Sequence, residues 1–148
     1  HLNLLKEDLL IFFSDVLISP ESLNKLLNNN LDFALLVDTD KCDESTMRIV
    51  IENDKISDIG SHIRPEDGDG NFIGIAKFSN QGSKLLKDKI KSLTESGMYK
   101  NDYYTKAVAK LAMERQSIIP VNIDGLPWME IDTYDEYQKA QKEIFYVI

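Results

Sequence analysis

The chain has 148 residues, of which 43% are hydrophobic and 28% are charged, and its formal net charge is −8. This length suits one domain, and the apolar content is sufficient for a packed core, which excludes an intrinsically disordered chain. The negative charge speaks against a general binder of nucleic acid, because such binding depends on clustered Lys and Arg. A single cysteine, Cys42, provides neither an intrachain disulfide nor a zinc cluster, which indicates a reducing cytoplasm.

No stretch approaches the roughly 20 apolar residues that cross a bilayer, so no membrane partner is expected. The longest apolar run, Leu9–Phe13, has the length of a buried strand instead. The chain begins at His1, without an initiating Met, a basic segment or a cleavage site. We therefore expect a cut or processed chain rather than a secreted one.

Two apolar runs with a helix between them open the predicted fold. Leu9–Phe13 predicts a strand buried on both faces, with Asp15 at its carboxyl tip. Ser19-Pro20 is typical of a helix N-cap and first helical residue, and this helix should end in Asn28–Asn30. Phe33–Val37 predicts a second buried strand. The order strand, helix, strand predicts a parallel sheet.

The middle of the chain predicts further strands. Met47–Ile51 and Lys55–Ile59 are separated by three polar residues and suit a hairpin at an edge of the sheet. Arg64–Gly70 has the Pro, Gly and Asp content of a loop, and Asn71–Phe78 resumes as a strand. The fold class that follows is mixed α/β.

Helices and short strands alternate over the rest of the chain. In order, we expect a helix from Ser79 to Gly97, a helix at Asp102–Gln116, strands at Ile118–Ile123 and Trp128–Ile131, and a last helix after Thr133. Thr133 and Glu136 form a capping box, worth about 1 kcal/mol. No repeat or linker is evident, so we expect residues 1–148 to form a single domain.

Two aspartates follow predicted strands, Asp15 after the first and Asp132 after the last. Ligand sites in open α/β sheets lie outside the carboxyl ends of strands. Carboxylates that meet there repel each other unless a cation lies between them, and oxygen ligands suit Mg²⁺ that bridges a substrate phosphate. Phosphoryl or nucleotidyl transfer would use such a site. The competing interpretation is that each aspartate only ends a strand or caps a turn.

Four segments in order resemble the nucleotidyltransferase superfamily: Phe13–Leu17, Leu35–Asp38, Phe72–Ser79 and Asp124–Thr133. The phosphocholine cytidylyltransferase-like branch is the most similar, because the Trp-x-Glu-Ile-Asp-Thr run before a helix is fairly specific for it. The resemblance implies a Rossmann-like, mainly parallel sheet flanked by helices.

In that branch a nucleoside triphosphate and a phosphorylated small molecule, such as phosphocholine, phosphoethanolamine or a phosphonate, join by in-line attack on the α-phosphate, and pyrophosphate leaves. The resemblance implies CTP as the nucleotide and magnesium as the cofactor, with Asp15 and Asp132 as catalytic metal ligands. Glu130 lies two residues before Asp132 on a strand and would face the same side. It would bind the metal or a cationic head group.

Four further residues are candidates for substrate binding. Trp128 and Tyr104, together with Tyr103, would line the acceptor pocket, where an aromatic face attracts a quaternary ammonium by about 0.5–2 kcal/mol. Lys77 would contact phosphate. The competing interpretation is core packing for the aromatic residues and a solvated position for Lys77.

The chain departs from the family at two places. Relatives often carry a phosphate-binding lysine where Ser61 stands, so Lys41, Arg64 or His62 is a candidate substitute. The glycine-rich loop that cradles the triphosphate, Gly-x-Gly-Thr-Arg followed by Pro-Lys, has no counterpart. We therefore expect only the carboxyl-terminal part of a nucleotidyltransferase, inactive alone, with the amino-terminal half removed or supplied by another chain.

Two alternatives remain. A non-catalytic truncated lobe would bind a ligand or partner, and it predicts an exposed apolar sheet edge that pairs with a complementing half or a second copy as a homodimer. A receiver-like or flavodoxin-like module also places acids at strand ends, but the predicted hairpin and the Trp-x-Glu-Ile-Asp-Thr run speak against it.

Overall fold

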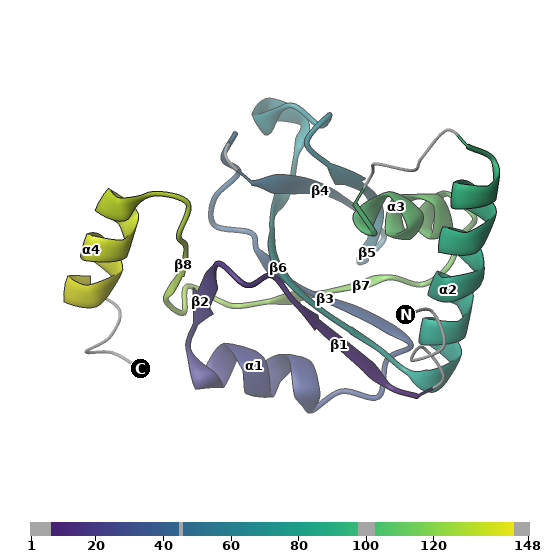
Figure 1. The fold of residues 1–148 in the computed structure, drawn as a ribbon, viewed down its shortest axis with the longest axis horizontal. Coiled ribbons are helices and arrows are strands. Elements are labelled where there is room, and N and C mark those ends of the chain that lie inside the picture. Colours follow the sequence, from purple (N-terminus) through teal and green to yellow (C-terminus); the bar gives the residue numbers. More distant parts are fainter. Residues whose placement is uncertain (1–6, 45, 98–102, 144–148) are drawn as a thin grey trace.

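The computed structural model describes residues 7–44, 46–97 and 103–143 (Figure 1). Its elements are β1 (Leu9–Phe12), β2 (Val16–Ile18), α1 (Pro20–Leu27), β3 (Phe33–Asp38), β4 (Met47–Glu52), β5 (Lys55–Gly60), a 3₁₀ turn (Pro65–Asp67), β6 (Gly70–Phe78), α2 (Asn80–Glu95), α3 (Thr105–Met113), β7 (Ile119–Asn122), β8 (Trp128–Glu130) and α4 (Tyr134–Glu143). The predicted helices and strands are confirmed, except that Asp102 lies outside the described residues. The sequence did not predict β2. Within the described ranges, no helix has both the length and the apolar character that a bilayer span requires.

The main sheet has the order β5-β4-β6-β3-β7, and β1 also pairs with β6. One edge of β6 pairs with β3, and β4 and β1 share its other edge. Mixed α/β architecture is confirmed. The expectation of a mainly parallel sheet is wrong, because β3–β7 is the only parallel pair among the described strands. β1 and β3 run in the same direction, but β6 lies between them and is antiparallel to both.

β1 and β4 diverge from each other beside Gly74. The backbone N–H of Phe13 donates to the Gly74 carbonyl at 3.0 Å, and Gly74 has a φ of +83°. A Cβ at this position would lie 2.8 Å from the Phe13 ring. Glycine therefore permits the end of β1 to approach β6 where the shared edge opens.

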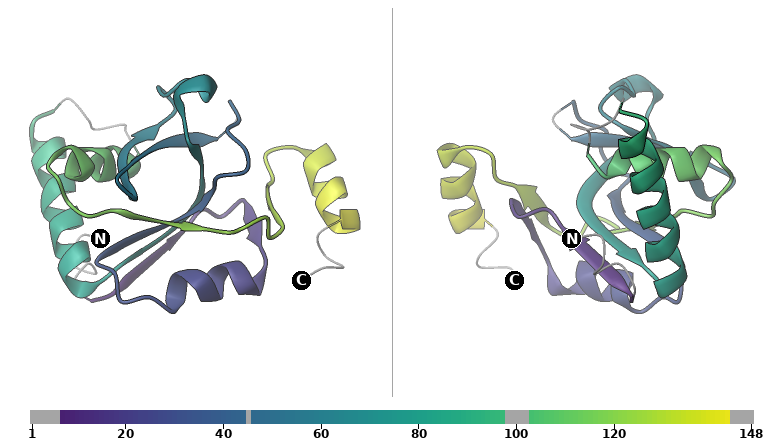
Figure 2. Two further views of the ribbon diagram at one scale, coloured as in Figure 1. Left: turned by 180° about the vertical axis from the view of Figure 1, so that it is seen from behind. Right: turned by 45° about the vertical axis from the view of Figure 1, so that its right-hand side comes forward.

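Helices cover both faces of the main sheet, with α1 on one side and α2 and α3 on the other (Figures 1 and 2). One core packs against α2 and α3 and contains Phe33, Phe78 and Leu86. The other lies under α1, around Leu26 and Leu36. The sheet also curves around α3, so that the Ile56 N–H donates to the Ile118 carbonyl at 2.8 Å.

β1 is buried on one face only. Leu9 and Ile11 pack against the core, whereas Leu10 and Phe12 are 38% and 43% exposed. The expectation of burial on both faces is wrong, because no described element covers the face that carries Leu10 and Phe12. β1 also pairs with no described strand on its outer edge. The exposed apolar edge that a truncated lobe predicts is therefore present.

β2 and β8 form a separate two-stranded antiparallel sheet, which leads into α4. Figures 1 and 2 both show α4 standing apart from the main sheet and its helices. The predicted capping box is confirmed, since the Thr133 N–H donates to Glu136 Oε2 at 2.8 Å and the Glu136 N–H donates to Thr133 Oγ1 at 3.3 Å.

Candidate metal and substrate site

The β2–β8 ribbon brings together acids from opposite ends of the sequence. Its register places Val16 opposite Glu130, and the Ile131 N–H donates to the Asp15 carbonyl at 2.8 Å. Asp132 follows directly and lies beside Asp15. The two aspartates do meet, but not at the ends of parallel strands as expected, because β8 belongs to the ribbon rather than to the main sheet.

Asp15, Glu130 and Asp132 form an acid triad. Each offers a carboxylate oxygen, and the three oxygens lie within 4.8 Å of one another. Asp15 Oδ1 is buried and has no hydrogen-bond partner in the described structure. Burial raises the pKa of Glu130 above its ordinary value of 4.5, and the charges of Asp132, Asp15 and Glu136 raise it further. Such mutual repulsion would be relieved by a cation between the carboxylates.

A cavity of about 670 Å³ opens beside the triad, and we call it the main cavity. Its walls come from the β1–β2 connection, the approach to β4, the end of β5 and β6. They are formed by Phe12–Asp15, Glu44, Thr46, Met47, Ser61, Phe72–Gly74, Tyr103, Glu130 and Asp132. No Lys or Arg is among these described residues, so the main cavity is acidic and partly aromatic.

A second pocket of about 170 Å³, which we call the side pocket, shares Thr46, Glu130 and Asp132 with the main cavity. The remaining lining residues are Lys41, Asp43, Trp128, Met129 and Glu136. The hydroxyl of Thr133 and two backbone N–H groups donate to Glu136 and lower its pKa. Glu130 and Asp132 therefore line both pockets, each of which is acidic, and among the described residues only the side pocket has a basic one, Lys41.

The structure places the other predicted site residues differently. Trp128 lines the side pocket rather than the main cavity, and its Nε1–H donates to Asp38 Oδ2 at 2.8 Å. Tyr104 packs edge-on against Phe13 and Phe78. It lines a third pocket, beside α2 and α3, rather than either of the two beside the triad. Burial raises its pKa.

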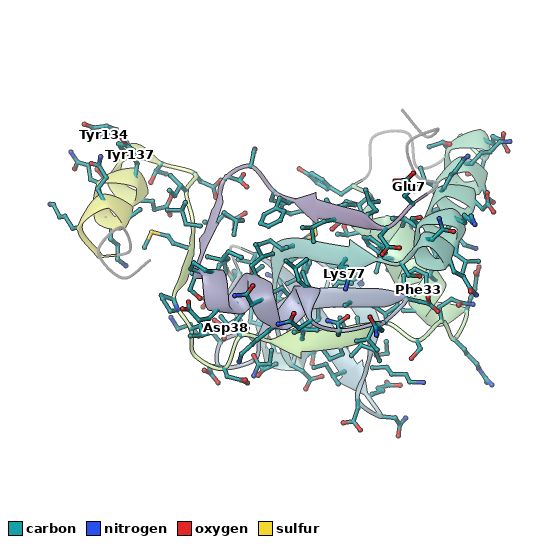
Figure 3. All side chains as sticks on the ribbon, turned by 90° about the horizontal axis from the view of Figure 1, so that it is seen from below. Glu7, Phe33, Asp38, Lys77, Tyr134 and Tyr137 are labelled. Atoms are coloured by element: carbon teal, nitrogen blue, oxygen red, sulfur yellow. The ribbon has the colours of Figure 1, made fainter. Side chains whose placement is uncertain are left out.

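Lys77 lies away from the triad. Its Nζ donates to the carbonyls of Leu27 and Asn29, near the end of α1. Figure 3 shows Lys77 near the Phe33 end of β3, whereas α4 lies beyond the Asp38 end. Of the predicted site residues, the structure thus brings together the three acids and places Trp128 beside them, but not Tyr104 or Lys77.

Sequence reasoning did not find Arg48, which holds part of the wall of the main cavity in place. Arg48 is 5% exposed, and its guanidinium donates to five backbone carbonyls, those of Asp43, Glu44, Thr46, Ser61 and Ile63. Three of these residues line the main cavity. The only sequence signal is an Arg within an apolar strand, and it does not identify the carbonyls that Arg48 binds.

No family model matches this sequence, and no curated protein matches it. Solved structures do match the fold. A glucose-1-phosphate thymidylyltransferase from Bacillus anthracis has a TM-score of 0.72 at 16% identity, over 95% of this chain and 56% of that one.

Two further matches carry related names. The inositol-1-phosphate CTP transferase of T. maritima has a TM-score of 0.63 at 19% identity, over 88% of this chain and 51% of that one. The CTP:phosphocholine cytidylyltransferase of Streptococcus pneumoniae has a TM-score of 0.66 at 15% identity, over 90% of this chain and 56% of that one. This chain therefore has a nucleotidyltransferase fold and spans about half the length of the structures that it matches.

Proposed function

We propose that this chain forms the metal-binding part of a nucleotidyltransferase that transfers a nucleotidyl group, cytidylyl by resemblance, to a phosphorylated small molecule and releases pyrophosphate. The observation that carries the proposal is the acid triad, which the ribbon assembles from residues 15, 130 and 132 beside a cavity of about 670 Å³. The non-catalytic alternative predicts the open edge of β1, but the same edge is expected of a transferase that lacks its other half, so it does not favour that alternative.

The triad fits magnesium by the chemistry of its donors. Mg²⁺ prefers oxygen ligands and is commonly held by one or two carboxylates together with substrate phosphates. Asp15 Oδ1, buried without a partner, is a ligand atom that the protein itself leaves unsatisfied. Asp15 and Asp132 are the proposed metal ligands, and Glu130 completes the set. When bound, the ion would neutralise charge that develops on the transferred phosphoryl group.

The chain's own residues would orient the reactants. In-line attack by an acceptor phosphate on an α-phosphate needs no covalent intermediate with the protein, but it does need the two reactants to be aligned. Metal ligands and cavity walls that hold the reactants in fixed positions would therefore supply much of the rate enhancement. The main cavity has acids and aromatic rings but no described Lys or Arg. This lining suits an acceptor with a cationic head group, such as phosphocholine, because carboxylates and aromatic faces both attract it.

The nucleotide-binding loop would come from polypeptide outside these residues. The open edge of β1, with Leu10 and Phe12 exposed, supports pairing with a complementing half or with a second copy. Alone, the chain should release no pyrophosphate from CTP and phosphocholine. Metal-dependent release of pyrophosphate by this chain alone would contradict the proposal that the nucleotide-binding loop must come from elsewhere.

Ligand-dependent stability tests the proposal directly. Magnesium, and magnesium with CTP or CDP-choline, should raise the melting temperature, because a ligand that binds only the folded state stabilises it, by about 2.7 kcal/mol at a hundredfold excess over Kd. An Asp15→Asn, Asp132→Asn double variant should lose the shift. Asp88→Asn, an exposed substitution on α2 that also removes one negative charge, should keep it. A shift that survives in the double variant would reject the triad as the metal site.

A further inference from the structure

The side pocket contains a lysine that the proposed function does not use. Lys41 is exposed, lines this pocket together with Glu130 and Asp132, and forms no ion pair with any residue in the described ranges. It is the only basic residue among the described residues that line either the side pocket or the main cavity. Within this pocket the ammonium of Lys41 faces four carboxylates, those of Asp43, Glu130, Asp132 and Glu136, but is bound to none of them, so it remains available to an anionic ligand.

The other two candidate phosphate ligands are engaged elsewhere. Arg64 forms ion pairs with Glu66 at 3.2 Å and with Asp67 at 2.7 Å. His62 Nε2 lies 2.8 Å from Asp58 Oδ2. Neither lines the main cavity or the side pocket, so Lys41 is the one of the three that the fold brings to the triad.

Thr46 adds a second polar group at the boundary of the two pockets. The Oγ1 atom of Thr46 is buried and has no hydrogen-bond partner in the described structure. Thr46 lines both pockets. A hydroxyl without a partner is free to donate to an anionic oxygen, and burial makes such a bond more favourable. Lys41 and Thr46 thus offer two donors beside the same pair of carboxylates.

The position of Lys41 favours a phosphate in the side pocket rather than in the main cavity. One divalent ion together with Lys41 would neutralise the three carboxylates of the triad. A phosphate oxygen could then join the metal's ligands while the ammonium of Lys41 offsets its remaining charge. Each pocket is lined by four carboxylates, but only the side pocket also has a basic residue, Lys41, so an anion placed in the main cavity would meet negative charge with no cation from the described walls to offset it.

We propose that the side pocket binds the phosphoryl group of the phosphorylated acceptor, with Lys41 Nζ and Thr46 Oγ1 as donors, while the main cavity takes the acceptor's organic portion. This inference rests on the proposed function and deepens it, because it assigns the two ends of the acceptor to two pockets. Lys41 would supply the cation that the family's lysine, absent at Ser61, supplies in relatives.

Calorimetric titration with phosphocholine and with choline, both in the presence of Mg²⁺, tests the assignment. Lys41→Met should weaken phosphocholine binding about tenfold, a change of about 1.4 kcal/mol, and leave choline binding unchanged. Thr46→Val should weaken phosphocholine by a few fold. Lys41→Arg should restore most of the affinity, because the charge is retained. Lys84→Met, an exposed substitution on α2, is the matched control and should change neither ligand.

Separate titration with Mg²⁺ alone distinguishes the two proposals. If Mg²⁺ binds through the triad but phosphocholine binds no better than choline, or Lys41→Met weakens both equally, the inference is overturned and the metal site stands. If the wild-type chain binds neither Mg²⁺ nor phosphocholine, both proposals fail. Intact folding of Lys41→Met, shown by an unchanged melting temperature without ligand, excludes a loss caused by unfolding.

Discussion

The main sheet with α1, α2 and α3 differs from the acid-bearing ribbon of β2 and β8 in what holds it together. All six residues of β3 are buried, as are eight of the nine in β6. By contrast, every residue of β2 and β8 is only partly buried, and α4 beyond them stands apart (Figure 1). Stability is therefore concentrated in the main sheet, whereas the geometry of the triad depends on a lightly buried ribbon. Substitutions should separate the two properties.

The largest effect should come from the core of the main sheet. Phe78→Ala should destabilise the chain by about 3–5 kcal/mol, because the ring is fully buried and packs edge-on against Phe33 at 5.8 Å and Tyr104 at 6.4 Å. Met129→Ala, on the ribbon, should cost far less. Denaturant unfolding measures both. Equal costs would remove the contrast between the regions.

Arg48, which lies in β4 of the main sheet and binds loops that line the main cavity, should give the next largest effect. Arg48→Met leaves the carbonyls of five residues without their donor, which should cost roughly 2–4 kcal/mol after water replaces some of the bonds. Arg48→Lys should recover only part, since an ammonium cannot span both loops. Unfolding curves decide this prediction, and a cost below about 0.5 kcal/mol would contradict it.

Glu130 should make the ribbon sensitive to pH. Its pKa in the folded chain is raised, so the folded state binds this proton more tightly than the unfolded state does. The resulting stabilisation is complete below the unfolded pKa, near 4.5, and is lost as pH rises through the folded pKa. Glu130→Gln should therefore raise the metal-free melting temperature at pH 7, and this advantage should shrink toward pH 4.

Melting temperatures of both proteins in EDTA, measured from pH 4 to 7, provide the test of the Glu130 prediction. The difference between them isolates this carboxyl, because the other acids titrate in both chains. Added Mg²⁺ should reverse the order at pH 7, since the variant has lost a ligand. A difference that does not change with pH would show that repulsion at Glu130 is unimportant.

The capping box should give the smallest effect. Thr133→Ala removes the hydroxyl that accepts from the Glu136 N–H and donates to its carboxylate, and should cost about 1 kcal/mol. Hydrogen exchange should quicken in α4, while global unfolding of the main sheet stays the same. Acidification through the lowered pKa of Glu136 should act similarly, since the cap is complete above the ordinary pKa and lost below the folded one.

The sequence predicts the local features of this fold well. Ser19 and Pro20 start α1 as expected, and Ser19 accepts from the Ser22 N–H. The hairpin of β4 and β5 turns at Asn53 and Asp54, both with positive φ. These signals involve residues a few positions apart, so pattern and turn chemistry are sufficient to read them.

Features that depend on distant pairing could not be predicted. Nothing in β1 or β3 indicates that β6 lies between them, and nothing in Val16–Ile18 indicates β8 as its partner. The triad was anticipated through resemblance rather than from spacing. The neighbours of Arg48 and of Lys41 come from segments that are distant in sequence and meet only in the folded chain. The residue type alone therefore does not predict what either side chain binds.

β6 follows β1 and β3 in the chain, so during translation it is made after these two strands, which both pair with it. β1 pairs only with β6 among the described strands, and β3 needs both β6 and β7 to complete its pairs. On the ribosome, the run Leu9–Phe13 therefore emerges long before the strand that shields its backbone. Nascent chains that end before Phe78 would present an unpaired apolar segment, and such segments are prone to aggregate. Chaperone contact early in translation would protect this chain until its central strand is made.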